Sequence, residues 1–139
     1  MKISLKYTII LIIAFFGISS CASFTLGNKD PEAMVRKNII ALMKVKIDGD
    51  WAKVYDFFDS NFKKQIKRKA FDHGNKAIFK SYHIEYIKVD PSGEWVDALV
   101  KQDMIVRSYN LKGVPEKQHW IKEKGKWVLV VKPAGNFID

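Results

Sequence analysis

The sequence predicts an α+β fold, in which N-terminal helices pack on a curved antiparallel sheet of about four strands. Two observations carry this prediction. Up to residue 79 the apolar residues recur at helical spacing, whereas from residue 81 onward they alternate with polar residues, as in strands. Short turn signals separate the alternating segments, and short connections between consecutive strands favour antiparallel pairing.

A long first helix is predicted to begin at Pro31 and to end near Ile47. Asp30 is a suitable N-cap, proline is favoured at the first helical position, and Gly49 suits the C-terminal cap. Four residues form its apolar stripe: Val35, Ile39, Leu42 and Met43.

Shorter helical segments are predicted between the first helix and residue 79. Asp50 and Ser60 are expected to cap two of them, and a third stretch is expected over 67–79, ending at Ile78 and Phe79. The aromatic and apolar residues at helical spacing after Asp50 are Trp51, Val54, Tyr55 and Phe58.

Four strands are predicted, over residues 81–89, 94–109, 116–123 and 127–132. The turns between them are expected at 90–93, 110–113 and 124–126.

The long strand over 94–109 has two different faces. The first face is almost entirely apolar, so we expect it to carry the helices, and the second is mixed, so we expect it to meet solvent or a partner. The first face consists of Val96, Ala98, Val100, Gln102, Met104 and Val106. The second consists of Trp95, Asp97, Leu99, Lys101, Asp103, Ile105 and Arg107.

The N-terminus has the parts of a secretory signal peptide over residues 1–20. Lys2 and Lys6 precede an uncharged apolar stretch over 7–18, which is shorter than the ~20 residues that span a bilayer as a helix. Two alternatives are a short uncleaved membrane anchor and a signal-peptide cysteine without a role.

Cys21, the single cysteine of the chain, follows Ile18-Ser19-Ser20, and this segment resembles the lipobox of bacterial lipoproteins. The resemblance implies cleavage before Cys21, a diacylglyceryl group on its sulfur and an acyl chain such as palmitate on its amine. Two or more acyl chains hold a protein stably on a membrane. Residues 21–29 would then be a lipidated tether and 30–139 a single α+β domain. The residues after Cys21 imply a location in the bacterial cell envelope, at the outer membrane facing the periplasm.

Three stretches resemble the nuclear transport factor 2-like (cystatin-like cone) superfamily: DGDWAKVYDFFD (48–59), WVDALVKQDMIV (95–106) and HWIKEKGKWVLV (119–130). The resemblance covers most of residues 31–132. It implies a cone formed by helices and a curved sheet, which is either a pocket or a filled core, and often a dimer through the outer face of the sheet.

The chain is basic, with a formal net charge of +9, which falls to +7 when Lys2 and Lys6 leave with the signal peptide. Part of the excess lies in the run over 62–71, which carries five lysines and arginines. Such a run can bind nucleic acid or an anionic membrane or glycolipid surface, or can simply face solvent. We expect no nucleic-acid partner, because no recognition motif is visible.

The sequence shows no catalytic constellation. Enzymes of the superfamily place an acid, a tyrosine or a histidine inside the apolar cone, but Asp97 and Asp103 fall on the mixed strand face. Asp72 and His73 are adjacent in a helical stretch, so their side chains point in different directions. His83 and His119 have no neighbouring ligand spacing, so we expect no metal and no cofactor.

The first hypothesis for function is therefore a membrane-anchored, non-catalytic module that binds another envelope protein, or a second copy of itself. The interface candidates are Trp95, Leu99 and Ile105. The second hypothesis is a cone that binds a small apolar or lipid-like ligand. Its lining candidates are Trp51, Tyr55, Phe58, Tyr86 and Met104. The third is a dehydratase- or isomerase-like enzyme.

Overall fold

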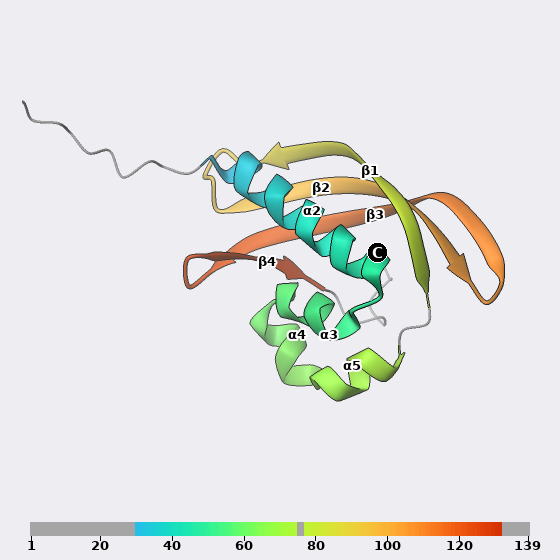
Figure 1. The fold of residues 1–139 in the computed structure, drawn as a ribbon. Helices are drawn as coiled ribbons and strands as arrows, with labels where there is room; N and C mark the ends of the chain where they lie inside the picture. Colours follow the sequence, from blue (N-terminus) through green and yellow to red (C-terminus); the bar gives the residue numbers. More distant parts are fainter. Residues whose placement is uncertain (1–29, 75–76, 132–139) are drawn as a thin grey trace, which may run out of the picture.

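The structure is a computed structural model that describes residues 30–74 and 77–131 (Figure 1). Its helical elements are α2 (Pro31–Asp48), α3 (Trp51–Val54), the 3-10 turn η1 (Tyr55–Phe57), α4 (Ser60–Gln65) and α5 (Arg68–Gly74). Its strands are β1 (Ile78–Val89), β2 (Trp95–Val106), β3 (Tyr109–Glu123) and β4 (Lys126–Val130).

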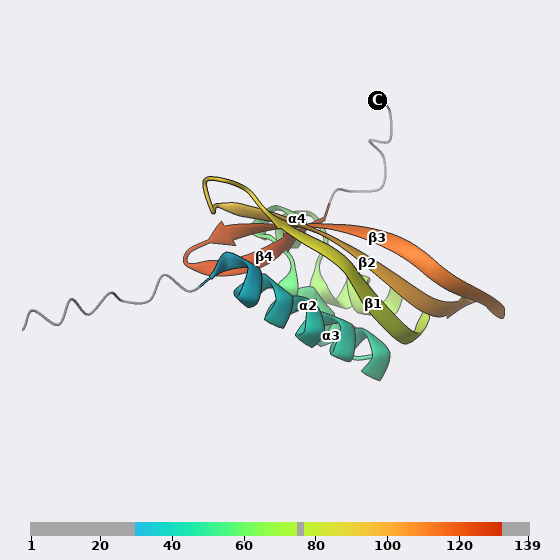
Figure 2. The same cartoon turned by 90° about the horizontal axis from the view of Figure 1, so that it is seen from above.

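The four strands form one antiparallel sheet in the order β1-β2-β3-β4, which confirms the predicted α+β fold. Helix α2 lies across one face of this sheet, and the shorter helices pack below it, beside β4 (Figures 1 and 2). We call the face under α2 the inner face and the opposite one the outer face. No helix in the described part of the chain crosses the outer face.

Helix α2 has the caps and the apolar stripe that its sequence predicts. The Asp30 carboxylate accepts a hydrogen bond from the backbone N–H of Glu32 at 3.0 Å, and Gly49 ends the helix with a φ of 73°. The residues of the stripe are fully buried against the sheet: Val35, Ile39, Leu42 and Met43.

The shorter helices fold around a cluster of aromatic rings. The ring of Phe58 lies 4.8 Å from that of Phe62 and 5.2 Å from that of Phe71, both in edge-on geometry. Trp51 lies 5.7 Å from Phe79, so the cluster joins the helices to β1. Aromatic pairs in such geometry each add about 0.5–1.5 kcal/mol beyond the burial of their surface.

Strand β2 alternates as predicted, with Val96, Ala98, Val100 and Gln102 buried on the inner face. This confirms that the apolar face of the long strand carries the helices.

The predicted helical stretch over 67–79 is wrong at its end. Helix α5 ends at Gly74, and Ile78 begins β1, where it pairs with Ile105 and is 53% exposed. A glycine weakens a helix interior, and the pairing with β2 decides the conformation of Ile78.

The predicted turn over 110–113 is also wrong. The chain reverses at Arg107 and Ser108, whose φ values of 47° and 72° are those of a two-residue hairpin turn, and β3 begins at Tyr109. The residues with turn chemistry lie instead where the pairing of β2 with β3 shifts register. There Gly113 has a φ of 62° and its N–H donates to Asp103 at 2.8 Å. Glycine with positive φ serves β-bulges as well as turns.

Candidate functional site: the outer face of the sheet

The outer face presents apolar and aromatic side chains that no described helix covers. It includes Trp95, Leu99 and Ile105, each partly exposed, and the more exposed Ile78 (53%) and Tyr86 (46%). These are the interface candidates of the mixed strand face, together with two residues that the sequence did not single out for it.

The strand register brings Trp95 and Leu99 together but leaves Ile105 apart. Trp95 and Leu99 flank Asp97 on the same face of β2, and Tyr86 lies directly opposite Leu99 on β1. Ile105 lies six residues beyond Leu99, at a strand rise of about 3.3 Å per residue. It pairs with Ile78 instead. The apolar residues of the outer face therefore form two groups.

Ion pairs and hydrogen bonds lie between and around these groups. His119 Nδ1 lies 2.6 Å from the Asp97 carboxylate, and the His119 ring lies 5.5 Å from that of Trp95. Lys101 pairs with Glu85 at 2.9 Å, and this ammonium lowers the pKa of Glu85. The side chains of these two pairs are 41–46% exposed. Strand register selects these partners, since each pair joins neighbouring strands.

Asp103 is the third acid of this face. The backbone N–H of Gly113 donates to it, and the Ser81 hydroxyl donates to it at 2.9 Å. These two hydrogen bonds hold the pKa of Asp103 below its ordinary value, and the bond from Gly113 has the larger effect.

A hollow of about 590 Å³ lies where β4 ends alongside β3. Its lining includes Tyr86, Asp97, Lys117, His119, Val130 and Val131. This volume lies within the range of ordinary ligand and side-chain pockets. The hollow therefore joins the group around Trp95 and Leu99 to the edge of the sheet.

A row of polar side chains on the inner face escaped the sequence analysis. The Lys46 ammonium, 7% exposed, lies 2.8 Å from both carboxylate oxygens of Glu116. Gln118 donates to Glu116 at 3.1 Å and accepts from the indole N–H of Trp120 at 3.1 Å. The signal was present: Lys46 continues the stripe of α2 at helical spacing, and Glu116 and Gln118 share the strand face of Trp120 at a spacing of two residues.

Gln102 lies on the same inner face, on the neighbouring strand β2. It is 5% exposed, and its side-chain oxygen has no hydrogen-bond partner in the structure. A buried acceptor without a donor costs about 1–3 kcal/mol, so this oxygen is a place where a bound donor would be favourable.

The five predicted pocket residues do not form one lining. Trp51, Tyr55 and Phe58 lie in the aromatic cluster and are at most 8% exposed, and Phe58 also borders a hollow between α4 and the hairpin of β3 and β4. Met104 lies at the border of the core. Tyr86 lies on the outer face, because the register shift between Ile84 and Tyr86 places it on the face opposite to Tyr82 and Ile84. This corrects its assignment to the cone.

The remaining candidates give no metal or catalytic cluster within the described residues. Residues 30–74 and 77–131 contain no group of three or more His, Cys, Asp or Glu side chains that could hold a metal ion. Asp72 is exposed, and the side chain of His73 lies outside the described residues, as does Cys21 with the whole predicted signal peptide and tether. In the same ranges, no helix combines the length and apolarity needed to cross a bilayer.

Neither the models of known protein families nor the curated protein sequences contain a match to this chain.

Proposed function

We propose that this protein is a bacterial envelope lipoprotein, anchored through Cys21, whose domain binds a protein partner through the outer face of its sheet. The fold proposed for that domain is the cone of the nuclear transport factor 2-like superfamily. The four-stranded antiparallel sheet with its helices is compatible with that fold, and the three sequence stretches that resemble the superfamily support it.

One observation carries the binding proposal: the outer face combines uncovered aromatic and apolar side chains with half-exposed ion pairs. Trp95, Leu99 and Tyr86 provide the apolar part, and the pair of His119 with Asp97 lies among them. Protein interfaces are enriched in aromatic residues, and an uncovered apolar patch bordered by polar side chains marks an interaction site. A face of this kind favours protein binding over catalysis in an apolar cone.

The test is site-specific photocrosslinking in the producing cell. A photoreactive residue replaces Leu99 in one variant and Lys44, on the exposed side of α2, in the control. We expect the first variant to crosslink one protein, identified by mass spectrometry, and the control not to do so. With that protein purified, Trp95→Ala should weaken binding about tenfold or more, as for an aromatic residue central to an interface.

Three results have a clear meaning. A crosslink between two copies of this chain would make the partner a second copy. Equal crosslinking from positions 99 and 44 would contradict the outer face as the binding surface. A Trp95→Ala variant that binds as the parent does would contradict it as well.

The anchor has its own test. Cys21→Ser should abolish lipidation and release the protein from the membrane fraction, because no acyl chain can then be attached. Retention of an unlipidated variant on the membrane would contradict the anchor.

A second candidate function is the binding of a small ligand at the inner face. The Gln102 oxygen without a partner favours it, since a ligand with a hydrogen-bond donor would satisfy that oxygen. Native mass spectrometry of the chain purified without denaturation tests it. An extra mass released by denaturation supports it, and Gln102→Leu should then abolish that mass.

A further inference from the structure

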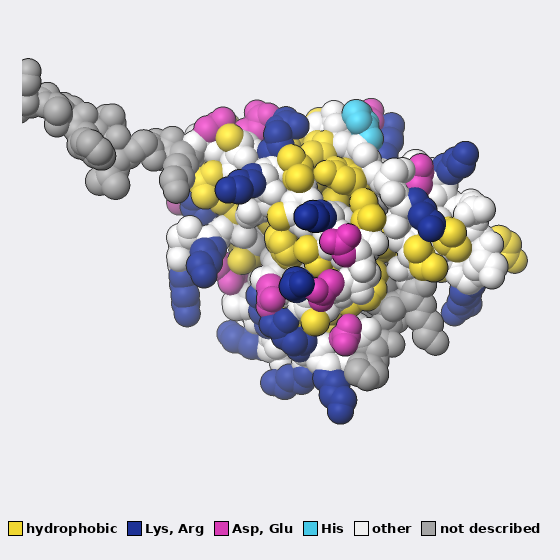
Figure 3. All heavy atoms as spheres, viewed as in Figure 1, with side chains coloured by type: hydrophobic (Ala, Val, Ile, Leu, Met, Phe, Trp, Pro, Cys, Tyr) yellow, Lys and Arg dark blue, Asp and Glu magenta, His cyan; other side chains and the backbone are white. Residues whose placement is uncertain are grey.

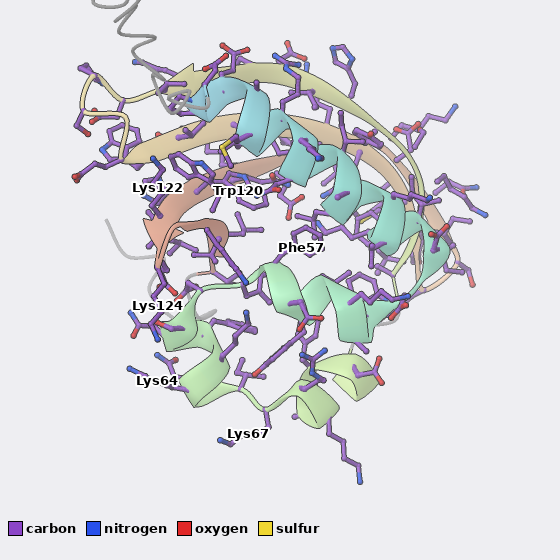
Figure 4. All side chains as sticks on the ribbon, turned by 60° about the vertical axis from the view of Figure 1, so that its left-hand side comes forward. Phe57, Lys64, Lys67, Trp120, Lys122 and Lys124 are labelled. Atoms are coloured by element: carbon purple, nitrogen blue, oxygen red, sulfur yellow. The ribbon has the colours of Figure 1, made fainter. Side chains whose placement is uncertain are left out.

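A basic hollow lies between α4 and the hairpin that joins β3 to β4. It has a volume of about 740 Å³, and its lining includes Lys64 of α4 and Lys124 and Lys126 of the hairpin. Figure 4 shows Lys64 and Lys124 projecting on the same side of the molecule from these two elements. Figure 3 shows lysines and arginines along the lower and left borders of the molecule, where these elements lie.

The two acids that line this hollow already have partners. The Glu123 carboxylate accepts hydrogen bonds from the backbone N–H and from the hydroxyl of Ser60, each at 3.1 Å. Asp56 pairs with Arg68, whose guanidinium also lies 4.9 Å from the ring of Tyr55.

The ammonium groups of Lys64, Lys124 and Lys126 have no such partner. Across residues 30–74 and 77–131, none of the three makes a side-chain hydrogen bond or an ion pair, and all three are exposed. Lys63, which also lines the hollow, is occupied because it donates to the backbone oxygen of Asp56 at 2.9 Å. The hollow therefore brings together three cations from two elements that are distant in the sequence.

A second, more apolar hollow adjoins the basic one. Its volume is about 320 Å³, and Met34, Phe57 and Trp127 are among its lining residues. The two hollows share Asp56, Lys126 and Val128, so a cationic and an apolar surface lie side by side. Phe57, labelled in Figure 4, comes from η1, and Met34 from the first turn of α2.

We propose that these two hollows bind the headgroup of an anionic phospholipid at a membrane surface. Lys64, Lys124 and Lys126 would hold the phosphate, and Met34 and Phe57 would contact the first carbons beyond it. Lysine binds phosphate as a point charge, and each lysine near an anionic surface strengthens binding by about fivefold. A free phosphate presents the same anionic oxygens but no apolar part, and the second hollow therefore favours the lipid.

This inference does not depend on the partner proposed for the outer face, nor on lipidation of Cys21. An anchor at Cys21 would add to it, because a tether over 21–29 reaches at most about 30 Å and leads into the helix that carries Met34. The anchored domain would then meet headgroups at high effective concentration.

Hydrogen exchange of the full-length protein tests the inference in micelles of a neutral maltoside detergent. One sample contains phosphatidylglycerol, and the other contains the zwitterionic phosphatidylcholine. With phosphatidylglycerol alone, we expect amides over 55–66 and 121–131 to exchange at least about threefold more slowly, since bound lipid stabilises the segments that hold it.

Two matched triple variants locate the effect. K64Q/K124Q/K126Q should abolish the slowing, whereas K44Q/K80Q/K112Q, with the same change of charge on exposed lysines elsewhere, should retain it. Unchanged exchange in β1 and β2 verifies that both variants are folded.

Several results would overturn the inference. It fails if phosphatidylglycerol slows no exchange in the two segments, or if both variants lose the slowing equally. If inorganic phosphate added to the phosphatidylcholine sample produces the same slowing, the ligand is a soluble phosphate and the lipid assignment is wrong.

Discussion

Lys46 and Glu116 form a buried ion pair. Removing the charge of Glu116 should lower the free energy of unfolding more than removing the charge of Lys46. Lys46 is 7% exposed and Glu116 is 28% exposed, and the ammonium lies 2.8 Å from both carboxylate oxygens. The perturbation is Glu116→Gln, which keeps the shape of the side chain and removes its charge. The lysine is then left buried without a counterion.

The expected cost follows from this burial. Removing one partner of a buried ion pair costs about 3–5 kcal/mol, and the partial exposure of Glu116 places Glu116→Gln at the lower end, about 3 kcal/mol. Lys46→Met should cost less, about 1–2 kcal/mol, because Glu116 keeps its exposure to water and its hydrogen bond from Gln118. In the double variant no charge is buried alone, so its cost should be about 1–2 kcal/mol and well below the sum of the single costs.

Urea unfolding followed by tryptophan fluorescence measures these differences. For a domain of this size the free energy of unfolding falls by about 1–2 kcal/mol per molar urea, so Glu116→Gln should lower the midpoint by about 2 M. The reasoning is refuted if Lys46→Met is as destabilising as Glu116→Gln, or if the double variant costs the sum of both.

Two further predictions concern carboxylates that accept backbone hydrogen bonds. Asp59, 3% exposed, accepts from the N–H groups of Asn61 (2.9 Å), Phe62 (3.1 Å) and Val131 (3.1 Å). Asp59 is the N-cap of α4. Asp59→Ala should therefore cost about 2–4 kcal/mol in the same urea experiment, and Asp59→Asn less; equal costs would contradict the role of the Asp59 Oδ1 atom as that cap. The lowered pKa of Asp103 contributes stability that is complete above the pKa of the unfolded chain and is lost as pH falls through the folded pKa. With Asp103→Asn, the free energy of unfolding should accordingly fall less steeply than that of the parent as the pH is lowered in the acid range. Equal slopes for variant and parent would contradict this.

Local sequence signals determined much of the fold. The caps and stripe of α2 follow from interactions within a few residues, as does the Lys124–Gly125 turn, where positive φ favours glycine. The alternation in β2 identified its inner face because one face of a sheet that packs on helices must be apolar. On the other face of β2, Trp95 and Leu99 stand out as interface candidates because they are large apolar residues among charged ones.

Register decided what those signals left open. Whether residues 110–113 form a turn or a bulge depends on how β2 pairs with β3, and the register shift between Ile84 and Tyr86 carries Tyr86 to the outer face. A shift of one residue moves a side chain to the opposite face of a sheet. The residues near Tyr86 in the sequence give no signal that predicts this shift.

The sequence by itself determined the class of fold, the stripe of α2, the faces of β2 and the resemblance of its N-terminus to a lipoprotein signal. Only the tertiary structure decided which polar and charged groups meet: Lys46 with Glu116, His119 with Asp97, and Lys64 with the hairpin lysines around one hollow. These groups are separated by 22 to 70 residues in the sequence. Their approach depends on the summed geometry of helix packing and strand pairing, which no local pattern of side chains encodes.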